Sequence, residues 1–277
     1  MGVARWQARG PVSVEKRREQ VRDMVEGVPL YDRFSESYDV MVDWRERLER
    51  EGPFFQELFS RNSAHRVLDV GSATGGHVIH FAEMGLEVVG VDPSAEMVRR
   101  AKTVAAGRTG ARFLRAGFGE LAKKVGGSFD VVTCLGNTLP HATTRRMLER
   151  ALVDMAAVLR PGGLLVIQQL NYDRILAERR RFLGVSSGVR DGVEHLFFRF
   201  YDYQGERLTF HVVTFKKEGG RWGFQVGSAP LRAIRQAELA ELLGLARFDP
   251  VQWYGGFSDE AFDSESSGDL VAVATRR

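Results

Sequence analysis

The chain has 277 residues, of which 44% are hydrophobic and 27% charged, a balance that supports a packed core and excludes wholesale disorder. Its 39 basic and 36 acidic residues leave a net charge of +3, which argues against a dedicated nucleic-acid or membrane-surface protein. The single cysteine, Cys134, excludes an internal disulfide and a multi-cysteine metal site. The N-terminus is charged and shows no apolar signal core, so we expect a cytoplasmic protein.

The beginning of the chain divides into a polar arm and an aromatic segment. Residues 1–30 are polar, and we expect an N-terminal arm with a helix or mobile stretch over residues 13–26. The following residues are aromatic, and Phe34 and Tyr38 recur at helical spacing. This pattern predicts amphipathic lid helices within residues 31–64.

The middle of the chain alternates short apolar runs with helical segments. The predicted strands are 67–70, 87–91, 111–115, 129–134 and 164–168, and the predicted helices are 75–84, 94–106 and 143–159. Pro161-Gly162-Gly163 is expected to stop the last of these helices. Alternation of this kind is typical of βαβ units, which build a parallel sheet with right-handed crossovers.

The pattern changes in the second half of the chain. Three successive strands without a helix between them are predicted at 195–203, 208–216 and 222–226, followed by a helix at 236–243 and closing strands at 251–254 and 270–274. The three successive strands indicate an antiparallel meander, and we expect an insertion over residues 190–230 that covers one end of the main sheet. No internal repeat or low-complexity linker divides the chain.

The turn after the first predicted strand carries the strongest functional signal. The strand ends at Val70 and a helix opens near Gly75, and Gly71 between them can take a positive φ without steric cost. Small residues let a ligand approach the backbone, and free amides at a helix start favour an electron-rich or anionic group. Ligands of open α/β sheets bind at this edge. A plain tight turn is the alternative interpretation of this segment alone.

The end of the second predicted strand sharpens this hypothesis. Asp92 stands there, and a carboxylate at this position can accept both hydroxyls of a ribose. Asp92-Pro93-Ser94 also has the pattern of a helix start, and both roles can hold together. The glycine spacing G-x-x-x-G-G departs from the dinucleotide fingerprint G-x-G-x-x-G. An adenosine ligand without a diphosphate therefore fits this turn better than a dinucleotide.

The turn and its flanks contain Asp69, Gly71, Thr74 and Gly75, and Asp92 follows one strand later. In these residues the sequence resembles the class I S-adenosylmethionine-dependent methyltransferases, whose first motif and ribose-binding acid they match. The resemblance implies a Rossmann-like α/β fold over residues 31–277, with a mostly parallel seven-stranded sheet, an antiparallel last strand and an antiparallel β insertion as a lid. It also implies S-adenosyl-L-methionine as the cofactor and S-adenosyl-L-homocysteine as the product.

The same resemblance implies a set of cofactor-binding residues. They are Tyr31, Tyr38, Asp69, Gly71, Ser72, Ala73, Thr74, Gly75, Asp92, Pro93, Met97, Gly117, Phe118, Leu135 and Gly136. Many relatives have an acid after the third strand that binds the adenine amino group, whereas this chain has Gly117 near that position. Phe118 is a candidate to stack on the adenine, with ordinary core packing as the alternative.

A narrower likeness concerns the segments after the fourth and fifth strands. Residues 134–141, with the sequence CLGNTLPH, and residues 171–176, with the sequence NYDRIL, resemble the glycine/sarcosine N-methyltransferases, the closest match in motif pattern. By that likeness, Asn137 hydrogen-bonds the substrate, and Tyr31 and Tyr38 cover the sulfonium.

Two further expectations follow from this likeness. Arg45 and His141 lie in segments that would face the same cavity. The family has an arginine directly before the Asn-Tyr-Asp motif that binds the carboxylate of the amino acid, whereas this chain has Leu170. A leucine cannot supply the paired donors that a carboxylate requires, so the likeness extends to the reaction rather than to glycine or sarcosine as substrates.

Methyl transfer from a sulfonium is an in-line displacement, in which orientation of the reactants supplies on the order of 7–11 kcal/mol of barrier lowering. The candidate catalytic residues are Asn137, His141 and Tyr38. An oxygen nucleophile would need a base, for which His141 is the first candidate, and His195 and His211 are further ones. Capping of the next helix is the alternative role for His141. No residue cluster has metal-ligand spacing.

We therefore predict an S-adenosylmethionine-dependent methyltransferase that transfers a methyl group to a small-molecule nitrogen or oxygen nucleophile. The predicted partner is the small-molecule methyl acceptor, with no membrane, and a homodimer stays open. An RNA or protein methyltransferase is the alternative, but it would need an open basic face, and the net charge of +3 and the lid argue against that. A dinucleotide-binding oxidoreductase is the third hypothesis.

Overall fold

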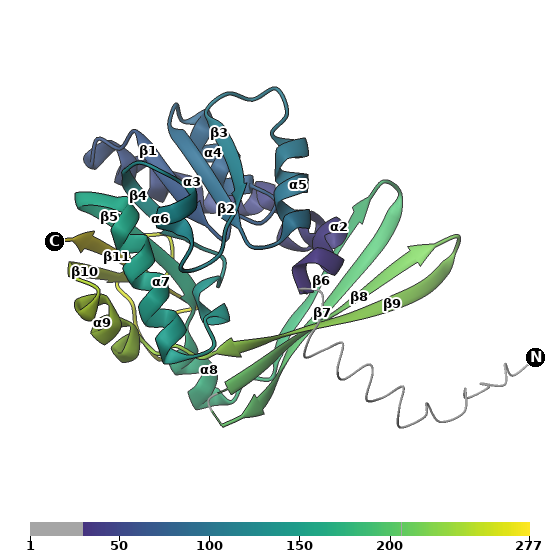
Figure 1. Cartoon of the computed structure of the whole chain (residues 1–277). Coiled ribbons are helices and arrows are strands. Elements are labelled where there is room, and N and C mark those ends of the chain that lie inside the picture. Colours follow the sequence, from purple (N-terminus) through teal and green to yellow (C-terminus); the bar gives the residue numbers. More distant parts are fainter. Residues whose placement is uncertain (1–29, 206) are drawn as a thin grey trace, which may run out of the picture.

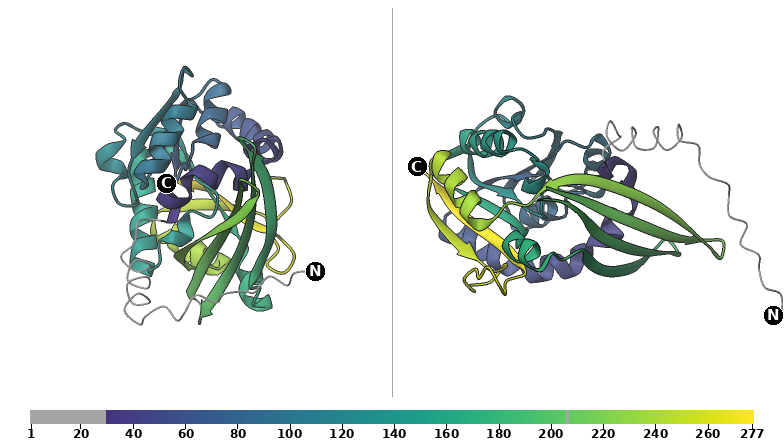
Figure 2. Two further views of the ribbon diagram at one scale, coloured as in Figure 1. Left: turned by 90° about the vertical axis from the view of Figure 1, so that its right-hand side faces the viewer. Right: turned by 90° about the horizontal axis from the view of Figure 1, so that it is seen from below.

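The structure is a computed structural model that describes residues 30–205 and 207–277. The helix predicted within residues 13–26 lies outside the described residues. The described chain forms an α/β domain and a second, antiparallel sheet that extends away from it (Figure 1). Views from two further directions show the same arrangement (Figure 2).

A seven-stranded sheet in the order β10-β11-β5-β4-β1-β2-β3 forms the centre of the α/β domain. Its strands are β1 (Arg66–Val70), β2 (Glu87–Asp92), β3 (Ala111–Arg115), β4 (Phe129–Cys134), β5 (Leu159–Leu170), β10 (Phe248–Tyr254) and β11 (Asp269–Arg276). Neighbours from β5 to β3 pair in parallel, while β11 pairs antiparallel with both β5 and β10. The predicted mostly parallel sheet with an antiparallel last strand is confirmed.

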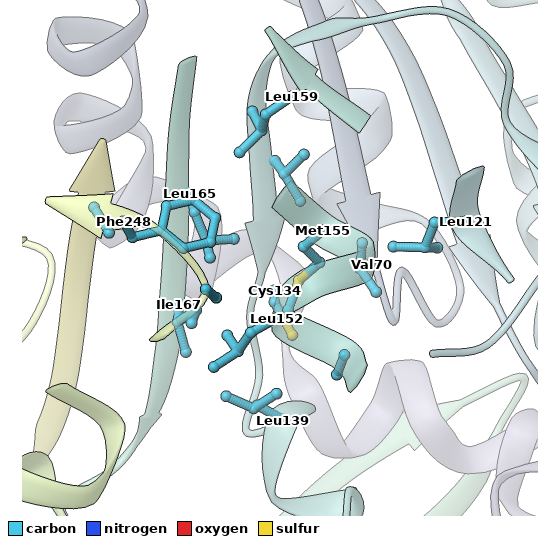
Figure 3. Packing of buried hydrophobic residues seen from close by; sticks show 14 of the residues in the cluster. Val70, Leu121, Cys134, Leu139, Leu152, Met155, Leu159, Leu165, Ile167 and Phe248 are labelled. Atoms are coloured by element: carbon cyan, nitrogen blue, oxygen red, sulfur yellow. The ribbon is translucent and has the colours of Figure 1, made fainter. Parts of the chain in front are cut away.

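Helices cover both faces of this sheet and enclose two apolar cores. The α-helices of the described residues are α2 (Leu30–Val42), α3 (Trp44–Arg61), α4 (Gly76–Glu83), α5 (Ala95–Val104), α6 (Leu121–Lys124), α7 (Arg145–Val158), α8 (Tyr172–Glu178) and α9 (Gln236–Leu245). One core joins the sheet to α6, α7 and α9, and Figure 3 shows the part to which Leu121 of α6 and Leu152 and Met155 of α7 contribute. The other core joins the sheet to α3, α4 and α5. Apolar runs that are buried on both faces are what parallel strands between helices require.

Local signals account for the element boundaries nearest the predicted site. The Ser94 hydroxyl caps α5 by accepting from the backbone N–H of Met97 at 3.0 Å. The end of α7 differs from the sequence expectation, because α7 ends at Val158 and β5 begins at once. Pro161-Gly162-Gly163 therefore lies inside β5, where the pairing with β4 shifts register. A bulge absorbs the residues that would otherwise have formed a turn.

The second sheet, called the cap sheet below, has the order β6-β7-β8-β9. Its strands are β6 (Phe182–Arg190), β7 (Val193–Gln204), β8 (Arg207–Glu218) and β9 (Arg221–Arg232), all antiparallel. The sequence predicted an insertion over residues 190–230 with three strands, so the expected extent was too short and β6 was missed. Serine and glycine at 184 and 186–188 break the apolar alternation by which a strand is recognised.

Helix α2 crosses the inner face of the cap sheet and joins it to the α/β domain. Leu30 lies against Gly227 of β9, and a Cβ atom on that glycine would be 2.1 Å from the leucine side chain. Phe34 meets Phe197 of β7 edge to face, with ring centroids 5.8 Å apart. Of the segment predicted as lid helices, α2 is thus packed between the two sheets, whereas α3 packs against the seven-stranded sheet.

Candidate functional site

A cavity of about 590 Å³ lies at the carboxyl ends of β1 to β4. Its other walls come from α2 and from strands β8 and β9 of the cap sheet. The lining includes the following residues singled out from the sequence: Tyr31, Tyr38, Gly71, Ala73, Asp92, Pro93, Met97, Gly117, Phe118, Gly136 and His141. The fold therefore brings together predicted residues from four separate loops and from α2.

The turn between β1 and α4 approaches the loop after β4 closely. Gly71 has a φ of +79°, and a Cβ atom there would lie 2.3 Å from Cγ2 of Thr138. The backbone N–H groups of Gly71 and Ser72 donate to the carbonyl of Val91 at 2.8 and 3.0 Å. Glycine alone accepts both the left-handed backbone and this close approach. The turn therefore presents backbone rather than a side chain to a ligand in the cavity.

Asp92 ends β2 with a carboxylate that is 7% exposed. One oxygen accepts from the backbone N–H of Ala73 and the other from that of Ser94, each at 2.9 Å. Each oxygen keeps a lone pair, so two adjacent hydroxyls, as on a ribose, can donate to it. Burial raises the pKa of Asp92 to about 6. The group is thus ionised at neutral pH and takes up a proton in mild acid.

Aromatic and neutral groups form the wall beneath α2. The Tyr31 hydroxyl and Nε2 of His141 are hydrogen-bonded at 2.9 Å. Burial lowers the pKa of His141 to about 4 and raises the pKa of Tyr31, so both side chains are neutral at pH 7. Burial also raises the pKa of Tyr38 to about 12. This part of the cavity is uncharged and aromatic, an environment that favours a cation through the ring faces.

Hydrogen bonds tie the junction of α2 and α3 to the turn after β1. Thr74 donates to Asp39 at 2.5 Å, and the indole N–H of Trp44 lies 3.1 Å from oxygens of both residues. The Trp44 ring fills the space beside Gly76, where a Cβ atom would lie 2.3 Å from it. These contacts hold α2 over the cavity.

Comparison with known proteins bears on this cavity and its fold. Residues 67–163 match the family model described as a methyltransferase domain. A solved S-adenosylmethionine-dependent methyltransferase from Clostridium acetobutylicum superposes with a TM-score of 0.74 over 89% of this chain and 98% of its own, at 15% identity. DesVI from Streptomyces venezuelae superposes with a TM-score of 0.70 over 87% and 98%, at 21% identity. Residues 67–163 thus match a methyltransferase domain, and the solved methyltransferases share the fold of most of the chain.

Several curated proteins to which this chain is similar are N-methyltransferases. The glycine/sarcosine N-methyltransferase of Parasynechococcus marenigrum is 39% identical over 52% of this chain and 51% of its own length. The glycine/sarcosine/dimethylglycine N-methyltransferase of Actinopolyspora halophila is 34% identical over 84% of this chain and 40% of its own. The chain thus spans about half the length of the curated relatives it matches.

Arg47 lies beside the cavity and was not singled out from the sequence. Its Nε donates to Glu51 at 2.9 Å, and its guanidinium lies 3.4 Å from where a Cβ atom of Gly136 would stand in the cavity wall. The sequence expectation for Arg45 is wrong, because that side chain is 88% exposed and pairs with Glu49. Helical phase distinguishes the two arginines, since Arg47 stands three residues after the inward-facing Trp44.

Some predicted cofactor residues support the cavity of the methyltransferase domain without lining it. The carboxylate of Asp69 accepts from the Thr133 hydroxyl at 2.7 Å beneath the turn. Gly75, with a φ of +89°, allows close packing against the Phe113 ring, which would lie 2.6 Å from a Cβ atom. The remaining residues of this kind are Ser72, Thr74 and Leu135, all buried.

Asn137, a candidate catalytic residue, is hydrogen-bonded behind the cavity wall. Its Nδ2 lies 2.9 Å from the Tyr172 hydroxyl, and its Oδ1 accepts from the backbone N–H of Leu170 at 3.2 Å. The lining does not include Asn137, and its contact with a substrate stays a prediction. His195 and His211 also lie outside the lining.

Two observations limit the chemistry of the part of the chain that the structure describes. No group of three or more His, Cys, Asp or Glu side chains within residues 30–205 and 207–277 is placed to hold a metal ion. Over the same residues, no helix has the length and apolar character needed to cross a bilayer.

Proposed function

We propose that the chain is an S-adenosylmethionine-dependent methyltransferase that methylates an amine of a small molecule. The observation that supports this most directly is Asp92 with two free lone pairs beside a turn that offers backbone to the cavity. The carboxylate of Asp92 can accept from both hydroxyls of a ribose, and the turn lacks the longer backbone cradle that a diphosphate needs. The N-methyltransferase names of the curated relatives agree with this proposal.

The residues present fit the cofactor in each of its chemical parts. Asp92 would hold the ribose hydroxyls, and Phe118 offers an aromatic face for the adenine. Arg47 would face the carboxylate of the cofactor's methionine part. Tyr31 and Tyr38 provide neutral aromatic surface for the sulfonium. The bound cofactor supplies a methyl group that its sulfonium charge already activates, so no metal is needed.

The protein's own part in the reaction is to orient the acceptor and exclude water. Helix α2 and strand β9 form walls of the cavity, and orientation of an acceptor between them supplies on the order of 7–11 kcal/mol of barrier lowering. His141 has a pKa of about 4 and is a poor base at neutral pH. An amine that arrives neutral needs no base, whereas an alcohol does. The lack of an effective base in the cavity wall therefore favours an amine over an alcohol as the methyl acceptor.

The walls of the cavity also bear on the kind of partner that it admits. A cavity walled by α2 and the cap sheet admits a small molecule more readily than an RNA or a protein side chain on a broad surface. We extend the proposal to a cytoplasmic homodimer without a nucleic-acid partner, consistent with the net charge of +3.

Calorimetric titration tests the proposed function. We expect binding of S-adenosyl-L-methionine and S-adenosyl-L-homocysteine and none of NAD. A screen with radiolabelled methyl groups across amines, phenols and carboxylic acids then identifies the acceptor class. Tight NAD binding without a response to either adenosyl ligand would overturn the proposal.

A further inference from the structure

The inner face of the cap sheet carries a partly buried cation without a counter-ion. Nε of Arg199 is buried and has no hydrogen-bond partner, and no described carboxylate pairs with its guanidinium. Arg100 and Arg232 also have an unpartnered Nε, but they pair through Nη2 with Asp39 and Glu238. Burial lowers the pKa of Arg199. A charge removed from water without a partner is costly, so a ligand that supplies the partner would be favoured.

The position of Arg199 connects it with the methyl-transfer space. Alternation along β7 puts it on the face that carries Phe197 and Tyr201, both almost fully buried. Its partner across the ladder is Val212, which lines the cavity. Tyr201 packs with Tyr172 in one buried cluster.

Tyr172 extends the connection to the loop after β4, because its hydroxyl bonds the side chain of Asn137. Arg199 itself is not in the cavity lining, but it neighbours Val212 of the cavity wall across the ladder and Tyr201 two residues along β7. Leu170 packs against the same tyrosine cluster and supplies no charge there.

We propose, as an extension that rests on the proposed function, that Arg199 binds an oxyanion of the methyl acceptor. The planar guanidinium matches a carboxylate or a phosphate through paired donors. The neighbouring tyrosines remain protonated, since burial raises the pKa of Tyr201 to about 12, and therefore cannot neutralise the cation. The acceptor is thus an amine that also carries a carboxylate or phosphate, and Arg199 determines its specificity.

The binding of oxyanions can be measured without turnover. We expect sodium acetate or inorganic phosphate to raise the thermal midpoint of the wild-type protein saturated with S-adenosyl-L-homocysteine, but not that of Arg199→Met. The anion with the larger shift identifies the carboxylate or phosphate. Arg221→Met, which removes an exposed arginine at the tip of the same sheet, should respond like the wild type. Equal shifts in all three proteins would overturn the inference.

Kinetics provide the second readout. Arg199→Met should raise KM at least tenfold for amines that carry an oxyanion, with a smaller change in kcat, while Arg199→Lys restores part of the loss. Activity on uncharged amines and affinity for S-adenosyl-L-homocysteine should not change. Failure of the wild type to bind either adenosyl ligand would sink the proposed function. If these ligands bind normally and the KM for amines that carry an oxyanion is equal in wild type and Arg199→Met, only the role of Arg199 is refuted.

The opposite face of the cap sheet supports a second, independent inference. Its apolar residues, called the outer apolar face, are Phe182, Val185, Val189, Leu196, Phe198, Phe200, Val213, Phe215, Trp222, Phe224 and Val226. Phe182, Phe224 and four others among them are 47% to 72% exposed. Helix α2 covers only the inner face (Figures 1 and 2). Contiguous apolar surface of this kind marks an interaction site.

The size and position of the outer apolar face indicate which partner covers it. At about 200 Å² per aromatic side chain and somewhat less per valine, the six most exposed residues present on the order of 600 Å². The half-buried members bring this close to the ~800 Å² that each partner contributes to a standard interface. Residues 1–29 include ten charged residues, and they precede Leu30, which lies on the inner face. A second copy can match the whole face by twofold symmetry.

We infer that two copies of the chain pack their cap sheets face to face through the outer apolar face. Sheets pack in this way about 10 Å apart with strands roughly aligned. The contact would also support β8 and β9 from behind, where these strands form the cavity wall.

Sedimentation equilibrium tests this interface. We expect the wild type to be a dimer and Phe224→Glu combined with Val185→Glu to be a monomer. Val153→Glu places the same charge on an equally exposed valine of α7 and should remain a dimer. A monomeric wild type, or a dimer that survives the double substitution, would refute the interface.

Discussion

Asp92 shows how one residue serves both the fold and the ligand. It satisfies two backbone N–H groups that would otherwise be buried without acceptors, and it keeps lone pairs directed at the cavity. Its raised pKa is the consequence of this burial, and it makes both ligand binding and stability depend on pH.

Affinity for S-adenosyl-L-homocysteine should fall as Asp92 takes up a proton. With a pKa of about 6, the dissociation constant should be flat above pH 7 and rise about tenfold per unit well below pH 6. Asp92→Asn should bind at least tenfold more weakly at pH 8 and show no such dependence. Calorimetry between pH 5 and 8 measures both. A pH-independent affinity of the wild type would show that another group holds the ribose.

The raised pKa of Asp92 should also make the stability of the ligand-free protein depend on pH. The folded protein holds the Asp92 proton up to a pKa of about 6, against 3.8 for the unshifted group. Because the folded state binds more protons between these values, the free energy of unfolding falls as pH rises through this window, by about 3 kcal/mol. The difference in unfolding free energy between Asp92→Asn and wild type should therefore increase in favour of the variant from pH 4 to pH 7 in urea titrations. A constant difference would contradict the shift.

Gly71 is restricted by both its backbone and its neighbours. Gly71→Ala should abolish ligand binding and destabilise the protein, because the new Cβ atom would overlap Thr138 and the φ of +79° is unfavourable for alanine. Gly85→Ala is the matched control, since Gly85 has a φ of +90° and open space around it. It should cost only ~1–2 kcal/mol. Chemical denaturation of both variants separates the two costs, and equal losses would rule out the contact with Thr138.

At the scale of elements, α2 belongs to both halves of the molecule. It packs against the cap sheet through Phe34 and is tied to the turn after β1 through Asp39. The closure of the cavity therefore depends on a few hydrogen bonds at the α2–α3 junction.

Trp44→Phe should loosen this closure while keeping most of the ring that fills the space beside Gly76. The variant loses an indole N–H shared between Asp39 and Thr74, a loss of about 1 kcal/mol or roughly fivefold in affinity. Calorimetry with S-adenosyl-L-homocysteine measures the affinity, and limited proteolysis detects cleavage within α2. Trp222→Phe at the exposed tip of the cap sheet serves as the control. Identical behaviour of both variants would show that the network does not hold α2.

At the scale of the whole molecule, the cavity takes its walls from the α/β domain, α2 and the cap sheet. A ligand that fills it should link all three. We expect S-adenosyl-L-homocysteine to slow hydrogen exchange in α2, in the turn at residues 71–75 and in β9 around residues 225–230. Helix α9 lines no part of the cavity and should not respond. Protection confined to the turn would mean that the cap closes independently of this ligand.

The amino-acid sequence by itself determined the parallel sheet, the turn at Gly71 and the place of Asp92. These features depend on signals within a few residues, such as a buried run, a glycine that must take positive φ, or an acid at a strand end. The expectations for Gly71 and Ser94 are confirmed by a positive φ and a helix cap. The edge strand β6 was not predicted because its serines and glycines interrupt the apolar alternation that identifies a strand.

Tertiary structure alone decided which distant side chains meet. Arg47 rather than Arg45 stands beside the cavity because of the phase in which α3 packs, and Asn137 bonds Tyr172 because the loops after β4 and β5 converge. The low pKa of His141 and the absence of a described counter-ion at Arg199 depend on burial among several elements. Burial and pairing of charges are sums over neighbours from the whole fold, and no stretch of sequence contains them.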